Sequence, residues 1–81
     1  LETERLTLRG RLTLKEADAR RLAVSINGDV SAVRMLLEPF APIEELKVEQ
    51  AAVQCVELAA KHAEYLGLLA EIAAMKKALG N

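Results

Sequence analysis

The chain has 81 residues, of which 52% are hydrophobic and 28% charged, and its net charge is −1. A chain of this length predicts one small domain, and the near-neutral balance excludes a protein that selects polyanions through a strongly basic field. Much of the apolar content is alanine, and Phe40 and Tyr65 are the only large aromatic residues, so the expected core is thin. A thin core favours association with a partner.

Cys55 is the only cysteine, which excludes a disulfide within the chain and favours a reducing compartment. No uncharged run approaches the ~20 residues needed to span a bilayer. A secretion signal would combine a basic segment with an apolar stretch after it, and the sequence shows no such pattern. We therefore expect a cytoplasmic protein without a membrane partner.

Residues 3–12 alternate leucines with polar side chains. Leu6 and Leu8 fall on one face of an extended chain, and the residues between them fall on the other. Alternation with a period of two is typical of a half-buried strand, so we expect a short strand over this range.

Two short helices are expected next. Thr13 begins a capping-box pattern, which predicts a helix over residues 14–26. Gly28 then favours a helix end, and Pro39 limits a second helix to residues 30–38.

The second half of the chain predicts one long helix over residues 43–79. Glutamates gather near its start and lysines near its end, which matches the helix dipole, and Gly80 favours a stop. Such a helix would be ~55 Å long at ~1.5 Å per residue, too long for the rest of the chain to cover. A break at Gly67 would instead give a compact four-helix bundle with less need for a partner.

Two stripes follow this long helix. One steps alternately by three and four residues, as a coiled-coil seam does, and the other is made of small residues that let another backbone approach closely. We expect one stripe to face the chain's own short helices and the other to face a partner. The seam comprises Val48, Ala51, Cys55, Leu58, His62, Tyr65, Leu69, Ile72, Lys76 and Leu79, and the small-residue stripe comprises Val53, Val56, Ala60, Ala63, Gly67, Ala70 and Ala74.

The sequence thus predicts a mainly α-helical domain, with a short N-terminal strand, whose bundle is completed by oligomerisation. A homodimer is favoured, and docking of a different protein on the same apolar face is the alternative. The residues expected at the oligomer interface are Leu58, His62, Tyr65, Leu66, Leu69 and Ile72.

No catalytic, cofactor-binding or metal-binding constellation is evident. Cys55 and His62 share the seam, but seven residues place them ~10 Å apart along a helix, too far for one metal ion with ligand bonds of ~2.0–2.3 Å. With one histidine and only Asp18 and Asp29 as aspartates, no catalytic triad is encoded. The four glycines are isolated and form no phosphate-binding loop. We expect a protein without enzymatic activity, cofactor or metal.

The N-terminal half offers an alternative function. A strand, a helix, an Asn-Gly-Asp turn and a second helix over residues 3–38 resemble the ribbon-helix-helix DNA-binding fold. The resemblance implies that two chains pair their strands and that Arg5, Thr7 and Arg9 enter the major groove, where arginine reads guanine edges.

Overall fold

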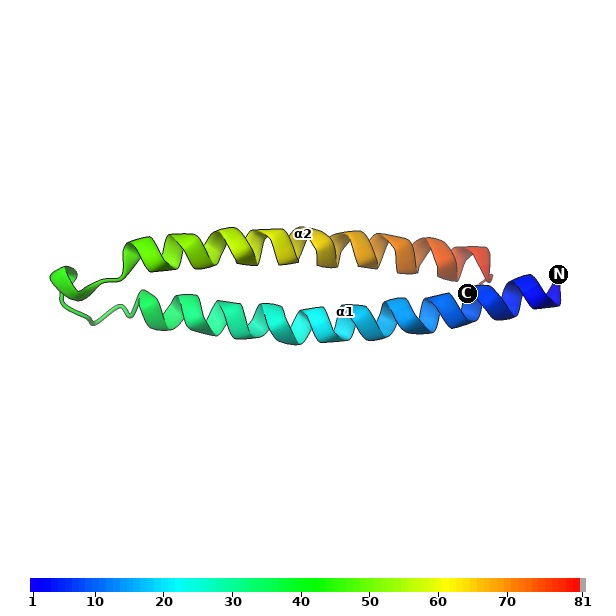
Figure 1. Cartoon of the computed structure of the whole chain (residues 1–81), viewed down its shortest axis with the longest axis horizontal. Coiled ribbons are helices and arrows are strands. Elements are labelled where there is room, and N and C mark those ends of the chain that lie inside the picture. The colour runs from blue at the N-terminus through cyan, green and yellow to red at the C-terminus, as the bar shows by residue number, and fades with distance from the viewer. Residues whose placement is uncertain (81) are drawn as a thin grey trace.

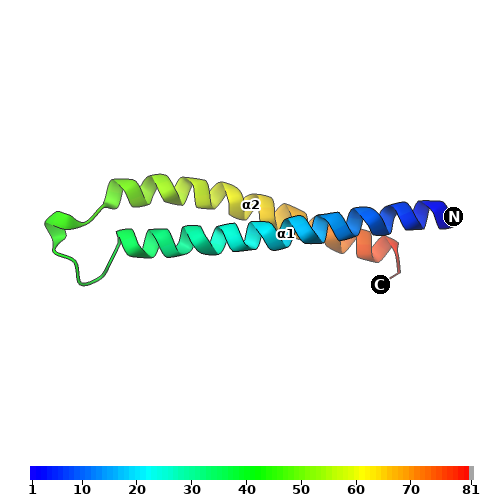
Figure 2. The same ribbon diagram turned by 60° about the horizontal axis from the view of Figure 1, so that its bottom comes forward.

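The computed structural model describes residues 1–80 and consists of two long helices that fold back on each other (Figure 1). Helix α1 spans Glu2–Leu36, the short 3₁₀ helix η1 spans Ile43–Glu45, and helix α2 spans Val48–Ala78. The two long helices run antiparallel in a rod of 64 × 16 × 14 Å. Figure 2 shows that they cross at a shallow angle, as helices packed along a continuous seam do. The expected mainly α-helical class is confirmed.

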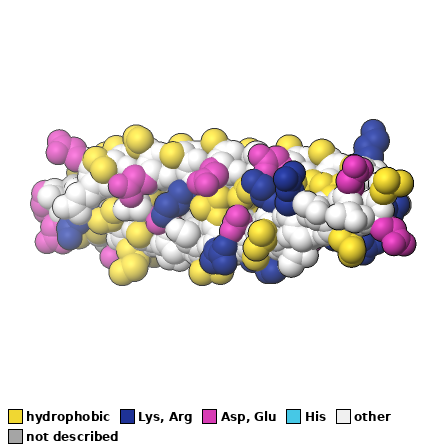
Figure 3. All heavy atoms as spheres, turned by 45° about the vertical axis from the view of Figure 1, so that its right-hand side comes forward, with side chains coloured by type: hydrophobic (Ala, Val, Ile, Leu, Met, Phe, Trp, Pro, Cys, Tyr) yellow, Lys and Arg dark blue, Asp and Glu magenta, His cyan; other side chains and the backbone are white. Residues whose placement is uncertain are grey.

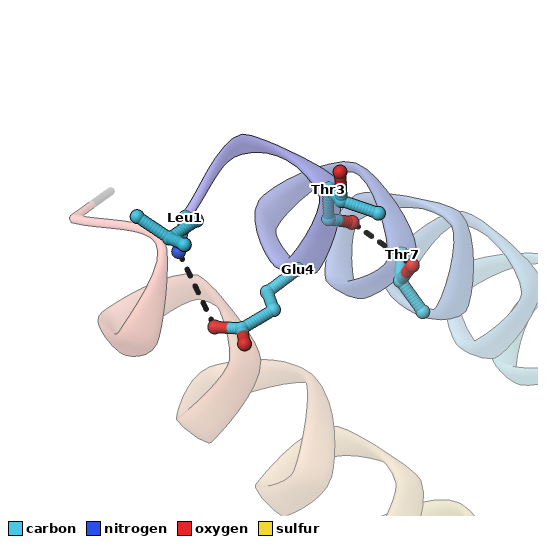
Figure 4. Close-up of polar contacts among 4 residues, drawn as sticks. All are labelled: Leu1, Thr3, Glu4 and Thr7. Carbon is cyan, nitrogen blue, oxygen red and sulfur yellow. Dashed lines mark hydrogen bonds and ion pairs between the residues drawn. The ribbon is translucent and has the colours of Figure 1, made fainter.

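Residues 3–12 form the first turns of α1, so the expected strand is wrong. The hydroxyl of Thr7 donates a hydrogen bond of 3.0 Å to the carbonyl of Thr3, one turn earlier (Figure 4). Figure 4 also shows the Leu1 amino nitrogen, 3.3 Å from the Glu4 carboxylate in the same turn. A threonine that bonds back to the preceding turn is accommodated within a helix, despite its preference for strands.

Packing explains why the helix prevails over the alternating pattern. Leu8 and Leu12 are four residues apart, which places them on one face of a helix as well as of a strand. Leu12 lies in the core and Leu8 packs against that core, while Leu6 is left exposed. Burial against α2 therefore selects the helical period over the local preference for a strand.

Helix α1 continues through both positions at which we expected a boundary. Thr13 is an interior residue whose hydroxyl donates to the carbonyl of Arg9 at 3.0 Å, so it does not cap a new helix. Gly28 keeps a helical backbone. The predicted separate helices over 14–26 and 30–38 are thus one helix. A glycine inside a helix costs about 1 kcal/mol, which the long packed interface with α2 outweighs.

Helix α2 confirms the long helix, which passes through Gly67 without a break. It begins later than predicted because the 3₁₀ turn forms first, with the Glu45 amide donating to the Pro42 carbonyl at 2.9 Å. Gly80 ends it as expected. Gly80 has a φ of 82°, and its amide donates to the Lys77 carbonyl at 3.1 Å.

The core is a single seam between the two helices. Its centre is formed by Leu12, Ala19, Ile72 and Leu79, with Leu8, Tyr65, Leu68 and Met75 packed around them. On both helices the seam residues step alternately by three and four, the spacing of a coiled coil. They are Leu8, Leu12, Lys15, Ala19, Leu22, Ile26, Asp29, Val33 and Leu36 on α1, and Ala51, Gln54, Leu58, Lys61, Tyr65, Leu68, Ile72, Met75 and Leu79 on α2 and its C-cap.

The observed seam of α2 agrees with the predicted one at every second position. Ala51, Leu58, Tyr65, Ile72 and Leu79 belong to both. The intervening positions are shifted by one residue towards the N-terminus. The structure uses Gln54, Lys61, Leu68 and Met75 in place of Cys55, His62, Leu69 and Lys76.

Candidate interaction surface on helix α2

Charged residues within the seam are paired between the helices. Lys61 Nζ lies 2.9 Å from Asp29 Oδ2 and donates a hydrogen bond of 2.8 Å to Ser25 Oγ. All three residues are at least partly withdrawn from solvent. A lysine at a seam position is tolerated here because α1 supplies its partners, and such polar pairs specify the register of two helices.

Two further ion pairs lie towards the open end of the hairpin. Lys15 Nζ is 2.9 Å from Glu71 Oε2, and Lys76 Nζ is 3.8 Å from Glu16 Oε2. The hydrogen bond and the charge of Glu71 raise the pKa of Lys15 above its ordinary value. These three ion pairs lie at different positions along the hairpin and align the helices in one antiparallel register. They also pair Lys61, Glu71 and Lys76 of α2 with charged side chains of α1.

The opposite side of α2 is apolar, and no helix of this chain covers it. We call it the outer face. Every one of its residues is exposed, with Val56 at 71% and Leu66 at 51%. Its members lie about half a helical turn away from the seam and include no charged side chain. They are Ala52, Val53, Val56, Ala59, Ala60, Ala63, Leu66, Gly67, Ala70, Ala73 and Ala74.

Charges appear only at the ends and borders of the outer face. The middle line of the outer face is a series of residues spaced by seven, and its two ends are Glu49 and Lys77. Figure 3 shows small apolar side chains along the edge formed by α2, with acidic and basic groups below them. Cys55, His62 and Leu69 form one border, and Glu57, Glu64 and Glu71 form the other.

The residues predicted at an oligomer interface divide between the two sides of α2. Ile72 is 8% exposed and lies in the core, where Tyr65 packs beside it, and Leu58 occupies the same seam. These three pack within the hairpin. The other three, His62, Leu66 and Leu69, are exposed and lie on the outer face or at its border. The predicted small-residue stripe covers most of the outer face, although its members were not named as interface residues and it omits Ala52, Ala59 and Ala73.

The residues predicted to contact DNA are not brought together on a sheet. Arg5, Thr7 and Arg9 belong to α1, and residues 1–80 contain no strand that could pair with a second chain. The Arg5 guanidinium donates a hydrogen bond of 3.2 Å to the Leu79 carbonyl, where it tethers the end of α2. The ribbon-helix-helix resemblance therefore loses the element on which it depended.

Within residues 1–80 no three histidine, cysteine, aspartate or glutamate side chains gather in a way that could hold a metal ion. Cys55 is exposed and stands apart as a free thiol. In the same range neither helix combines the length and the apolar character needed to cross a bilayer. Comparisons with protein-family models, curated proteins and solved structures return no match to this chain. The outer face of α2 and the residues around it are therefore the features from which a function can be inferred.

Proposed function

We propose that this chain is a non-catalytic oligomerisation module, in which the outer face of α2 packs against the same face of a second copy. One observation carries the proposal. The outer face is exposed and uncharged from Ala52 to Ala74, a length of ~33 Å at ~1.5 Å per residue. A continuous apolar patch with charged residues at its ends and borders is often a site of association.

The thinness of the hairpin core supports a partner that is itself helical. Among the described residues only Leu12, Ala19, Ala51, Ile72 and Leu79 are buried, and no side chain is fully buried. A second hairpin placed on the outer face would turn a two-helix layer into a four-helix assembly, with α2 covered on both sides. This is the usual way in which a chain with a small core gains stability.

The composition of the outer face supports a second copy as its occupant. An uncharged surface offers nothing to a strongly charged partner, such as a nucleic acid, but it matches another uncharged surface. The outward side of α1 is less suitable because it carries Arg20 and Arg34, both exposed. The outer face of α2 is therefore the side on which two hairpins meet with the least burial of charge.

The size of this interface sets the expected affinity. A strip ~33 Å long and ~10 Å wide presents on the order of 300 Å² from each copy. Stable complexes commonly bury ~800 Å² from each partner, so we expect a dissociation constant in the micromolar range or above. Association should accordingly be measured up to several hundred micromolar.

Sedimentation equilibrium of the 8.8 kDa chain tests the proposal, with expected masses rising towards twice that value as concentration increases. Leu66→Glu places a charge on the outer face and should keep the chain monomeric. Val24→Glu is the matched control, because Val24 is 73% exposed on α1, away from the outer face. Circular dichroism of both variants should show the helix content of the parent chain.

Two results would overturn the proposal. One is a parent chain that stays monomeric at the highest concentration. The other is a dimer that Val24→Glu disrupts as strongly as Leu66→Glu, because the interface would then not be the outer face. Should Leu66→Glu lose helix content, Ala63→Lys provides the same test at a residue that is also exposed.

A further inference from the structure

We infer that the two copies pack antiparallel, with Ala63 on the two-fold axis and Glu49 of each copy facing Lys77 of the other. The inference rests on the proposed self-association and assigns its partner geometry. It starts from the middle line of the outer face, which reads Glu49, Val56, Ala63, Ala70 and Lys77 at a constant spacing of seven residues. Seven residues are close to two helical turns, so these side chains stay on one line.

The charges on this line are arranged symmetrically about Ala63. Glu49 lies fourteen residues before Ala63 and Lys77 lies fourteen residues after it. Antiparallel packing about Ala63 therefore brings each glutamate to a lysine of the other copy, twice in the dimer. Parallel packing in register would place Glu49 against Glu49 and Lys77 against Lys77. A self-complementary patch of this kind is what a two-fold interface requires.

Side-chain size follows the same symmetry. In the antiparallel arrangement, Val56 faces Ala70 and Leu66 lies beside Ala59 of the other copy. Val53 lies beside Ala74 in the same way. Each of these larger side chains thus meets a small one, which allows two helices to approach closely without a void or a clash. Parallel packing would instead place Leu66 against Leu66 and leave the alanines facing each other.

In the antiparallel dimer the glutamate borders of the two copies lie along the same edge, outside the packed face, where salt screens their repulsion. Glu57, Glu64 and Glu71 lie on the side of α2 that turns towards α1, beyond the small residues of the face. Glu71 is already paired with Lys15 at 2.9 Å. The remaining two are exposed, so water can solvate them in the dimer.

Disulfide trapping in the full chain tests the orientation. With Cys55→Ser as background, single cysteines are introduced as Val56→Cys or Ala70→Cys, and each protein is oxidised gently alone and in an equimolar mixture. In the antiparallel arrangement residue 56 faces residue 70, and two copies of residue 56 lie ~21 Å apart. A disulfide requires Cα atoms within ~7 Å, so only the mixture should cross-link, giving the mixed species by mass.

The other outcomes distinguish a wrong orientation from a wrong interface. Cross-linking of each variant alone, without the mixed species, would show parallel packing; the orientation would then be wrong and self-association would stand. Ala63→Cys serves as the positive control, because it should cross-link with itself. A dimer in sedimentation that gives no cross-link in any of these proteins would place the interface elsewhere and overturn both.

Charge exchange provides a second test that needs no oxidation. At ~50 mM salt, Glu49→Lys or Lys77→Glu should each weaken the dimer by roughly tenfold, and the double variant E49K/K77E should restore the parent affinity. Parallel packing predicts that none of the three changes the affinity, since like charges already face each other in the parent chain. Equal weakening by the double variant would also contradict the proposed pairing.

Discussion

The carboxylate of Asp29 and the ammonium of Lys61 meet inside the seam, with Lys61 Nζ 2.9 Å from Asp29 Oδ2. The approach is not aligned as a hydrogen bond, and Oδ2 has no other hydrogen-bond partner among residues 1–80. The side chains of Asp29 and Lys61 are 15% and 35% exposed, respectively. The contact is therefore mainly an attraction between charges, and Asp29 depends on it more than Lys61 does.

Lys61→Met should destabilise the hairpin by about 1–3 kcal/mol, because it leaves the Asp29 carboxylate in the seam without its cation. The double variant Asp29→Leu with Lys61→Leu should recover most of that loss, since apolar residues of similar size then fill the seam. Urea denaturation followed by circular dichroism measures both. A Lys61→Met variant as stable as the parent chain would show that the pair contributes nothing.

Ile72→Ala should cost about 2–5 kcal/mol, the range for truncating a large aliphatic side chain in a core. Ile72 is 8% exposed and packs with Leu12 and Leu79, so the loss falls in the centre of the seam. Leu14→Ala is the control, because Leu14 is 67% exposed, and its change should stay within about 0.5 kcal/mol. Similar thermal midpoints for the two variants would contradict the assignment of the core.

The long helix α2 and its end could be predicted because local signals agree there. The dipole-matched charges and Gly80 act within a few residues, and no tertiary contact has to override them. The N-terminal strand failed for the opposite reason. Leu8 and Leu12 fit a strand and a helix equally well, and the contact with Ile72 and Leu79, some sixty residues away, decides between them.

The predicted seam of α2 differs from the observed one at alternate positions because apolar residues recur on more than one side of α2. Cys55, His62 and Leu69 form as regular a series as Gln54, Lys61 and Leu68 do, and hydrophobicity alone favours the first. The structure selects the second because Asp29 and Ser25 on α1 provide partners for Lys61. The three-four spacing of leucines, alanines and valines along α1 was the signal that could have revealed this seam.

Glu71→Gln should lower stability at neutral pH, and the difference from the parent chain should vanish in alkali. Glu71 raises the pKa of Lys15 above 10.5 in the folded chain. A raised lysine pKa contributes stability that is fully present below the unfolded pKa and is lost as the pH rises through the folded pKa. Urea midpoints of both chains between pH 7 and about pH 11.5 measure the difference.

Glu64→Gln is the matched control for that experiment. Glu64 lies on the same border of α2, one heptad before Glu71, and forms no ion pair within residues 1–80. Its difference from the parent chain should stay constant over the same pH range. A difference for Glu71→Gln that grows with pH would contradict the sign of the coupling.

Gly67→Ala and Gly28→Ala should separate the folding of the hairpin from its association. Both glycines lie inside helices, and an added Cβ would meet nothing within 4 Å at either position. Each change should therefore stabilise the isolated hairpin by up to about 1 kcal/mol, because alanine has the higher helix propensity. Gly67, however, lies on the outer face, where the antiparallel dimer places it beside Ala60 of the other copy. We expect Gly67→Ala to raise the thermal midpoint of the dilute chain and yet weaken the dimer, whereas Gly28→Ala raises the midpoint and leaves the dimer unchanged. Sedimentation equilibrium alongside thermal melts measures the two effects, and an equal dimer affinity for both variants would show that no close helix contact forms at Gly67.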